Sequence, residues 1–242
     1  MTNNIAGLLA VAVAADPTRP LLTFYDDATG DRTELSGATL ANWVAKTANL
    51  LVDEAGTAPG DAVEVRLPPH WQTAAVLLGC WSAGLVVGVD PAAEVLFATG
   101  DTATDGSKTD GSATGGSSDA GAHPAGQRYL LTLAPMAAPA RTLPNGWSDY
   151  ITEVRGHGDH FTPYPAVDPQ DADLAGRAVE QGARLGFATG SRILLDADRY
   201  PDPVDWLLAP LAADASVVLC RNLDRRLLDK RTRSERVDQA LI

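Results

Sequence analysis

Two histidines and an aspartate stand close together in the segment His157-Gly158-Asp159-His160. Imidazole nitrogens and carboxylate oxygens are ligands that a metal such as zinc accepts. The spacing is loose, the glycine disfavours a rigid helix, and no further ligand stands nearby in the sequence. We therefore interpret His157, Asp159 and His160 as part of a polar loop, with a metal site as the alternative.

The other residue types that carry out chemistry stand in apolar surroundings. Cys80 and Cys220 lie in the runs VLLGCWSAG and SVVLCRN, so we interpret them as buried free thiols; no spacing rule favours a disulfide between them. Trp71, Trp81 and Trp206 are predicted to pack in the core rather than to form a ligand cage. The sequence contains no G-x-S-x-G, H-E-x-x-H, C-x-x-C, Walker or Rossmann glycine motif. We therefore predict no catalytic, cofactor-binding or metal-binding residue, and no cofactor.

The net charge of the chain argues against two classes of partner. The 242 residues include 31 Asp and Glu against 19 Lys and Arg, which gives a formal charge of −12. A surface this negative repels phosphate backbones and anionic lipids, so we predict no nucleic-acid partner and no membrane partner. No apolar run reaches the ~18 residues that cross a bilayer, and no Lys or Arg precedes the first apolar run as in a signal peptide. We therefore expect a cytoplasmic protein.

The elements that must position these residues alternate between strand and helix. The runs LLTFYD (21–26) and RTEL (32–35) flank a turn that ends in Gly30, which is typical of a hairpin. Further strands are predicted at 62–67, 85–91, 128–133, 191–196 and 216–220, and helices at 5–15, 36–51, 71–83, 170–184 and 203–213. This alternation predicts an α/β fold with a mixed, largely parallel sheet and helices on both faces.

Two segments depart from the alternating pattern. Residues 98–126 are all Gly, Ala, Thr, Ser or Asp, apart from single Lys, His and Pro residues, and cannot bury enough apolar area to offset their ordering entropy. We predict a flexible insertion there, within one α/β domain built from 1–97 and 127–222, and expect its deletion to leave the melting temperature nearly unchanged. Residues 223–242 are predicted to form a polar, solvated C-terminal helix, with binding of an acidic partner as the alternative.

The order of motifs in the first half matches a known family. The stretches LSGATLANWVAKTANLL, APGDAVEVRLPPHW and AAVLLGCWSAGLVVGVDP resemble the N-terminal region of AMP-binding, acyl-adenylate-forming synthetases. A second match, DWLLAPLAADASVVLCRN (205–222), is similar to a helix-strand unit of the same family, with Asp214 where the family usually has glycine. The plan resembles a short actinobacterial family of synthetase-like proteins. The resemblance implies the fold of a truncated synthetase N-terminal half.

The loop that holds the ATP phosphates in this family is missing its characteristic residues. The family loop has the form [ST]-[SG]-G-[ST]-T-G-x-P-K, in which backbone amides cradle the phosphates and the lysine supplies charge. It is expected between the strand at 128–133 and the helix at 170–184, where TEVRGHGDHFTPYPAVDP (152–169) has no lysine. The sequence also has no aromatic-Gly-x-Thr-Glu segment, no later ribose-binding aspartate and no C-terminal domain with a catalytic lysine.

The insertion offers one alternative phosphate loop. It contains glycines, serines, threonines and Lys108, but four aspartates would repel phosphate and it precedes the wrong strand: Asp101, Asp105, Asp110 and Asp119. We therefore expect a non-catalytic binding or regulatory relative of the synthetases, in self-association or with a protein partner. The alternatives are an adenylating ligase that acts as half of a split complex, and a different activity in the inherited cleft.

Overall fold

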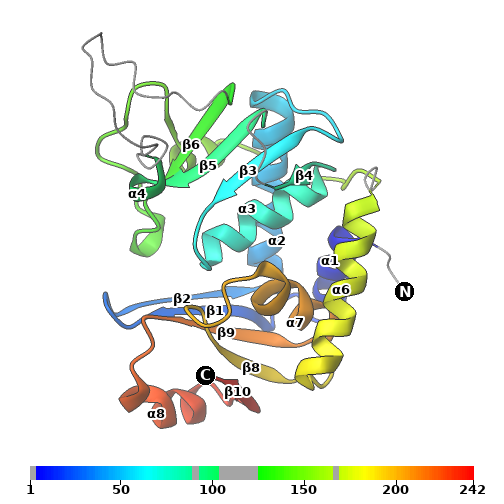
Figure 1. Ribbon diagram of the computed structural model, residues 1–242, viewed down its shortest axis with the longest axis vertical. Helices are drawn as coiled ribbons and strands as arrows, with labels where there is room; N and C mark the ends of the chain where they lie inside the picture. The colour runs from blue at the N-terminus through cyan, green and yellow to red at the C-terminus, as the bar shows by residue number, and fades with distance from the viewer. Residues whose placement is uncertain (1–3, 89–92, 104–124, 166–168) are drawn as a thin grey trace, which may run out of the picture.

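The structure, a computed structural model, describes residues 4–88, 93–103, 125–165 and 169–242. It contains two five-stranded sheets, one above the other, with helices between and beside them (Figure 1). The predicted α/β class with largely parallel strands and helices is confirmed. The expected single sheet is wrong, because the strands divide into two sheets.

Sheet A has the order β10-β8-β9-β1-β2. Its strands are β1 (Pro20–Asp26), β2 (Asp31–Ser36), β8 (Arg192–Asp196), β9 (Ser216–Arg221) and β10 (Gln239–Leu241). Only the hairpin β1–β2 is antiparallel; the other neighbours run parallel. Gly30 closes the hairpin turn with φ +76°, a conformation that glycine adopts without strain. The predicted hairpin is therefore confirmed.

Sheet B has the order β4-β3-β5-β6-β7 and all its described pairs are parallel. Its strands are β3 (Ala62–Arg66), β4 (Val86–Val87), β5 (Val95–Thr99), β6 (Gln127–Leu131) and β7 (Ser148–Asp149). Parallel strands need crossover connections, because each connection must bring the chain back to the end of the sheet where the previous strand began.

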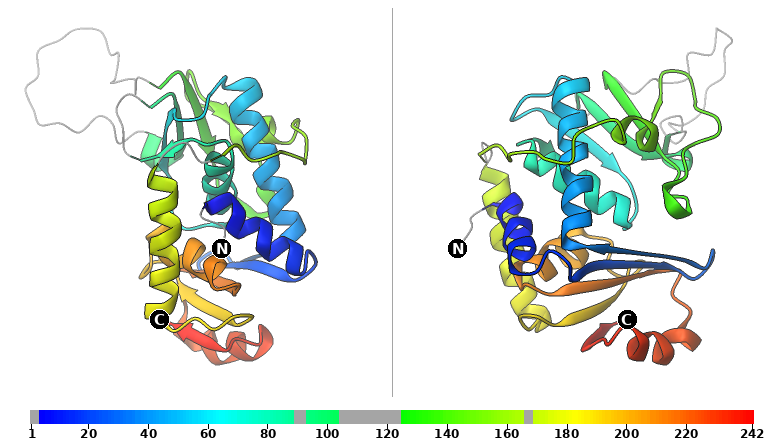
Figure 2. Two further views of the ribbon diagram at one scale, coloured as in Figure 1. Left: turned by 90° about the vertical axis from the view of Figure 1, so that its right-hand side faces the viewer. Right: turned by 180° about the vertical axis from the view of Figure 1, so that it is seen from behind.

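Helices fill the space between the sheets and cover their sides (Figures 1 and 2). They are α1 (Ile5–Ala15), α2 (Gly37–Asn49) with its π-helical extension η1 (Leu50–Glu54), α3 (Trp71–Ser82), α4 (Gly100–Ala103), η3 (Pro135–Ala137), α5 (Tyr150–Val154), α6 (Pro169–Leu185), η4 (Val204–Leu208), α7 (Ala209–Ala212), η5 (Arg225–Leu227) and α8 (Leu228–Ser234). Helix α3 is buried along its whole length, as its uniformly apolar sequence predicts. Ser36 Oγ accepts a hydrogen bond from Thr39 N at 3.2 Å, which confirms the predicted N-cap of α2.

The boundaries of the predicted insertion need correction. Ala98 and Thr99 belong to β5, where Ala98 is fully buried, and α4 follows directly. Ala125 is buried as well, just before β6. Parallel pairing with β3 and β6 recruits the first residues of a polar stretch whose composition alone gave no strand signal. Residues 104–124 lie outside the described part of the chain.

The C-terminal segment is not the solvated helix that its arginine content predicts. The short helix α8 packs on the face of sheet A that points away from sheet B (Figure 1). Its Arg231 is only 6% exposed, and β10 then pairs in parallel with β8. Burial is possible because Arg231 has an ionic partner, Asp27. The segment thus contributes the edge strand β10 to sheet A, and α8 packs beside the sheet.

Candidate functional site

A cleft of about 630 Å³ opens where strands of both sheets end. Ligands of open α/β sheets bind in crevices outside the carboxyl ends of the strands, so this position singles the cleft out. Its walls come from the hairpin turn, the ends of β3, β5, β6 and β9, and the loop after β6: Phe24, Asp26, Ala28, Thr29, Asp31, Pro68, His70, Thr99, Gly100, Leu130, Leu131, Thr132, Leu133, Ala134, Pro135, Ala140, Arg141, Thr142, Arg221 and Asn222. Sequence reasoning predicted no residue of this group as a site residue.

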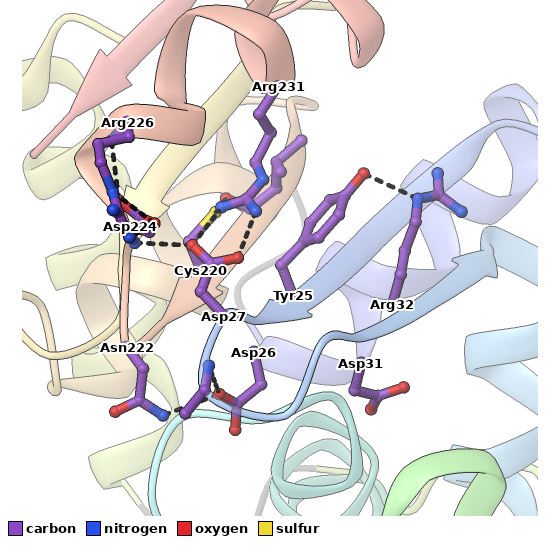
Figure 3. A network of polar contacts seen from close by, with 12 residues as sticks. Tyr25, Asp26, Asp27, Asp31, Arg32, Cys220, Asn222, Asp224, Arg226 and Arg231 are labelled. Carbon is purple, nitrogen blue, oxygen red and sulfur yellow. Dashed lines mark hydrogen bonds and ion pairs between the residues drawn. The ribbon is translucent and has the colours of Figure 1, made fainter.

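Two carboxylates lie in the hairpin wall of the cleft. Asp26 Oδ1 accepts hydrogen bonds from Ala28 N at 2.9 Å and from Asn222 Nδ2 at 2.8 Å, so it fixes both the turn and the end of β9 (Figure 3). Burial raises the pKa of Asp31, and the nearby charge of Asp26 adds to this shift. The structural bonds of Asp26 indicate that its carboxylate supports the wall.

Two arginines line the cleft as well. Arg221 ends β9 and is half-buried, while Arg141 lies in the loop after β6 and is exposed. Within the part of the chain that the structure describes, neither guanidinium forms an ion pair. Arg221 and Asp26 are register partners on adjacent parallel strands, so the sheet fixes where the side chain of Arg221 starts. The cleft therefore contains the half-buried positive charge of Arg221, which forms no ion pair with any residue that the structure describes.

His70 stands between β3 and α3 with its side chain 1% exposed. Its Nδ1 accepts a hydrogen bond from Gln72 N at 3.1 Å and so caps α3. Burial, together with the charge of Arg221, lowers the pKa of His70 to about 3, so the ring is neutral at physiological pH. Because Nδ1 is the acceptor, the single ring proton is on Nε2. That Nε2–H has no hydrogen-bond partner in the described structure, which makes it a buried, unused donor.

The loop 132–142 follows β6 and forms the far wall of the cleft. Like the stretch 152–169, this loop lies between β6 and α6, the interval in which the family's phosphate loop is expected. Counted from Thr132, it matches the motif at the first position and at the eighth, Pro139. Alanine stands at the lysine position, Ala140, and the loop contains neither glycine nor lysine.

The backbone of this loop is engaged by its own surroundings. Thr132 Oγ1 donates to Ala138 O at 2.8 Å and accepts from Ala134 N at 3.2 Å. Ala140 N donates to Asp149 Oδ2 at 2.7 Å, and Ala138 N donates to Pro135 O at 3.3 Å. Amides that are already bonded cannot cradle a phosphate, and no lysine supplies charge. The loop therefore does not fit the triphosphate of ATP in the way that the family motif does.

Three residues of the loop have left-handed backbone conformations without being glycine. They are Leu133, Met136 and Ala137, with φ of 53°, 58° and 52°. Counted from Thr132, Ala137 stands at the sixth motif position, where the family has glycine, and Met136 stands directly before it. Left-handed conformations strain residues that carry a Cβ. The loop thus has a backbone shape suited to glycine but side chains that the family motif does not have.

A partly buried polar network holds the hairpin that lines the cleft (Figure 3). Arg231 Nη2 donates to Asp27 Oδ1 at 2.5 Å, and its guanidinium lies 4.1 Å from the centroid of the Tyr25 ring. Glu235 Oε1 accepts from Tyr25 Oη at 2.5 Å and from Arg32 Nη2 at 2.9 Å. The C-terminal segment therefore fixes the hairpin whose turn lines the cleft.

The residues considered as metal ligands lie elsewhere. His157 Nε2 is 3.1 Å from Glu54 Oε2, and the backbone oxygen of His157 accepts from Lys46 Nζ. His160 is exposed and lines a separate apolar groove with α1 and α2. Among the described residues, no three His, Cys, Asp or Glu side chains come together as metal ligands. His157 and His160 therefore do not contribute to the cleft.

The cysteines and tryptophans lie in the core, as predicted. Cys80 and Cys220 are buried free thiols, in α3 and β9. Burial raises the pKa of the Cys220 thiol to about 11, although Arg231 acts against the shift. Trp71, Trp81 and Trp206 are all buried. Over the described part of the chain, no helix has both the length and the apolarity to span a bilayer.

The sequence is similar to known proteins over most of its length. A family model described as "AMP-binding enzyme" matches residues 9–93. A "TIGR03089 family protein" from Mycobacterium tuberculosis is 42% identical over 251 residues, which cover 99% of this chain and 98% of the relative.

Solved structures show the same fold. An acyl-CoA synthetase from Brucella canis superposes with a TM-score of 0.71 at 15% identity, over 98% of this chain and 46% of that one. The N-terminal domain of FACL13 from Mycobacterium tuberculosis superposes with a TM-score of 0.69 at 13% identity, over 99% of this chain and 62% of that one. The chain therefore spans less than two thirds of both solved structures. The resemblance to AMP-binding synthetases is confirmed for the fold and for the N-terminal motifs.

Proposed function

The chain belongs to the TIGR03089 family, and from that premise we propose that it is a non-catalytic binding protein that retains the synthetase scaffold. In this proposal, the cleft between the two sheets holds a small organic molecule but does not activate it with ATP. The chain needs no cofactor for this role. Fold alone does not guarantee an ancestral chemistry, so the residues of the site decide whether it is retained.

The loop 132–142 is the observation that carries the proposal. Acyl-adenylate formation in the family requires amides and a lysine arranged around the phosphates of ATP. The loop 132–142 contains neither lysine nor glycine, and the amides of Ala134, Ala138 and Ala140 already have protein acceptors. Stabilisation of developing charge by fixed donors is usually the largest single contribution to such a reaction. A loop without free donors at these positions supplies little of it.

The remainder of the cleft favours binding rather than loss of all function. It has a volume of about 630 Å³, which is in the usual range for sites of small molecules. Its lining combines apolar side chains such as Phe24 and Leu131 with the charged Arg221. A few polar groups among apolar walls are typical of a ligand site.

ATP–pyrophosphate exchange tests the proposal. The purified full chain is assayed with MgATP and a panel of fatty, aromatic and amino acids, beside a synthetase that has the complete loop. The proposal predicts exchange at the level of the reaction without protein for every acid. Reproducible exchange with any one acid would show that the chain is catalytic and would overturn the proposal.

A further inference from the structure

We propose that His70 and Arg221 together form the recognition site for an oxyanion, a carboxylate or a phosphate group, of the molecule in the cleft. This inference rests on the proposed function, since it names the chemistry by which the same cleft selects its ligand. Neither residue belongs to the loop 132–142, so the site is a second wall of the cleft.

The imidazole of His70 offers a hydrogen-bond donor to the cleft. It lines the cleft, is 1% exposed, and has an Nε2–H without a partner among the described residues. Buried polar groups are nearly always bonded, and each exception needs an explanation such as a missing ligand. The capping bond from Gln72 N to Nδ1 and the edge-on contact with Phe24, at 4.3 Å between ring centroids, fix the ring. The unused donor is therefore preorganised.

Arg221 supplies the charge. It lines the same cleft, is half-buried, and has no ion pair within the described structure. Both residues line the same cleft, and the charge of Arg221 contributes, after burial, to the lowered pKa of His70. A neutral N–H donor beside a guanidinium suits an acceptor that carries negative charge.

Within the described residues, neither carboxylate of the hairpin wall forms an ion pair with Arg221. Asp26 is 9% exposed and uses one oxygen to bind Ala28 N and Asn222 Nδ2. Asp31 has a raised pKa because it is buried near Asp26. Phe24, Leu130 and Pro68 offer apolar contact to the body of the ligand.

Histidine side-chain NMR tests the inference with two probes, inorganic phosphate and benzoate. The full chain is labelled with ¹⁵N-histidine, and the Nε2 resonance of His70 is assigned by its loss in His70→Asn. Asparagine is among the best N-cap residues, so this variant keeps the cap of α3 but removes the Nε2 donor. The inference predicts a saturable shift of the His70 Nε2–H resonance with at least one probe. Phosphate and benzoate as separate titrations identify which oxyanion the site accepts.

Matched arginine variants complete the experiment. Arg221→Gln is expected to weaken binding of that probe by about tenfold or more, the size of a lost charge-assisted bond. Arg225→Gln, at an exposed arginine outside the cleft, is expected to leave it unchanged. The inference is wrong if neither probe shifts the His70 resonance, or if both arginine variants bind alike. These outcomes do not depend on pyrophosphate exchange. Oxyanion binding can therefore be disproved while the absence of catalysis stands, and catalysis can be found while oxyanion binding stands.

Discussion

Gly79 in α3 packs so closely against Thr47 in α2 that a Cβ on Gly79 would lie 2.6 Å from Thr47 Cβ. This contact brings α2 and α3 together, and Thr47 is itself fixed by a 2.7 Å hydrogen bond between its Oγ1 and Tyr150 Oη. No side chain can be added there without moving backbone.

Replacement of Gly79 by alanine should therefore destabilise the fold strongly. We expect Gly79→Ala to lower the free energy of unfolding by about 3 kcal/mol, at the upper end for overpacking a core. Gly176→Ala is the matched control, because nothing lies within 4 Å of its added Cβ on the exposed side of α6. It should raise stability by about 0.5–1 kcal/mol through helix propensity. Urea unfolding measures both; similar effects of the two substitutions would contradict the close packing of α2 and α3.

The strained loop after β6 gives a second prediction. Met136 is 90% exposed and has φ 58°, so Met136→Gly removes a strained Cβ without loss of packing. We expect a gain of about 0.5 kcal/mol, because relief of left-handed strain exceeds the added entropy of the unfolded chain. Ala138, with φ −71°, is the control, and Ala138→Gly should lose about 0.5–1 kcal/mol. Equal losses in both variants would show that Met136 is not strained.

A third prediction concerns acid stability through Glu235. Burial raises the pKa of Glu235, but hydrogen bonds from Tyr25, Arg192 and Arg32 outweigh this and lower it to about 2. Since the folded pKa lies below the ordinary 4.5, the carboxylate stabilises the fold above pH 4.5, and this contribution is lost as the pH falls toward 2.

Glu235→Gln tests this sign. The variant should be less stable than the parent by about 2 kcal/mol near neutral pH, because the arginines lose a charged acceptor. The difference should shrink as the pH falls below 4.5. Unfolding by urea over a pH series measures it, with Glu180→Gln on the exposed face of α6 as the control. A difference that is constant across the series would contradict the ionic role of Glu235.

The local elements could be predicted from the sequence, whereas their assembly could not. Apolar periodicity and caps such as Ser36 determine where α2 begins, and these signals are local. The division into two sheets depends on pairs such as Leu22 with Val217, which are far apart in the chain. No local pattern specifies such partners. The C-terminal arginines illustrate the same limit, because burial of Arg231 depends on Asp27 at the other end of the chain.

The site was missed for related reasons. His70 follows a strand that ends in two prolines, which suggested only a turn, and its exposed or buried state depends on Phe24 from the other sheet. At Asp214, by contrast, the difference from the family's usual glycine pointed to a position where the backbone conformation is restricted. It has φ 53°, which explains the glycine usual at that position, and Arg19 Nη2 donates to its Oδ1 at 2.7 Å.

Direct detection of acyl-adenylate tests the central claim most simply. The purified chain, in an amount equal to the nucleotide, is incubated with MgATP and each carboxylic acid of a panel, and acyl-AMP is measured by mass spectrometry in a single turnover. The account predicts no acyl-AMP above the reaction without protein, because the loop 132–142 has no lysine and its amides at Ala138 and Ala140 are engaged. Acyl-AMP formed reproducibly from any one acid, above the reaction without protein, would contradict it.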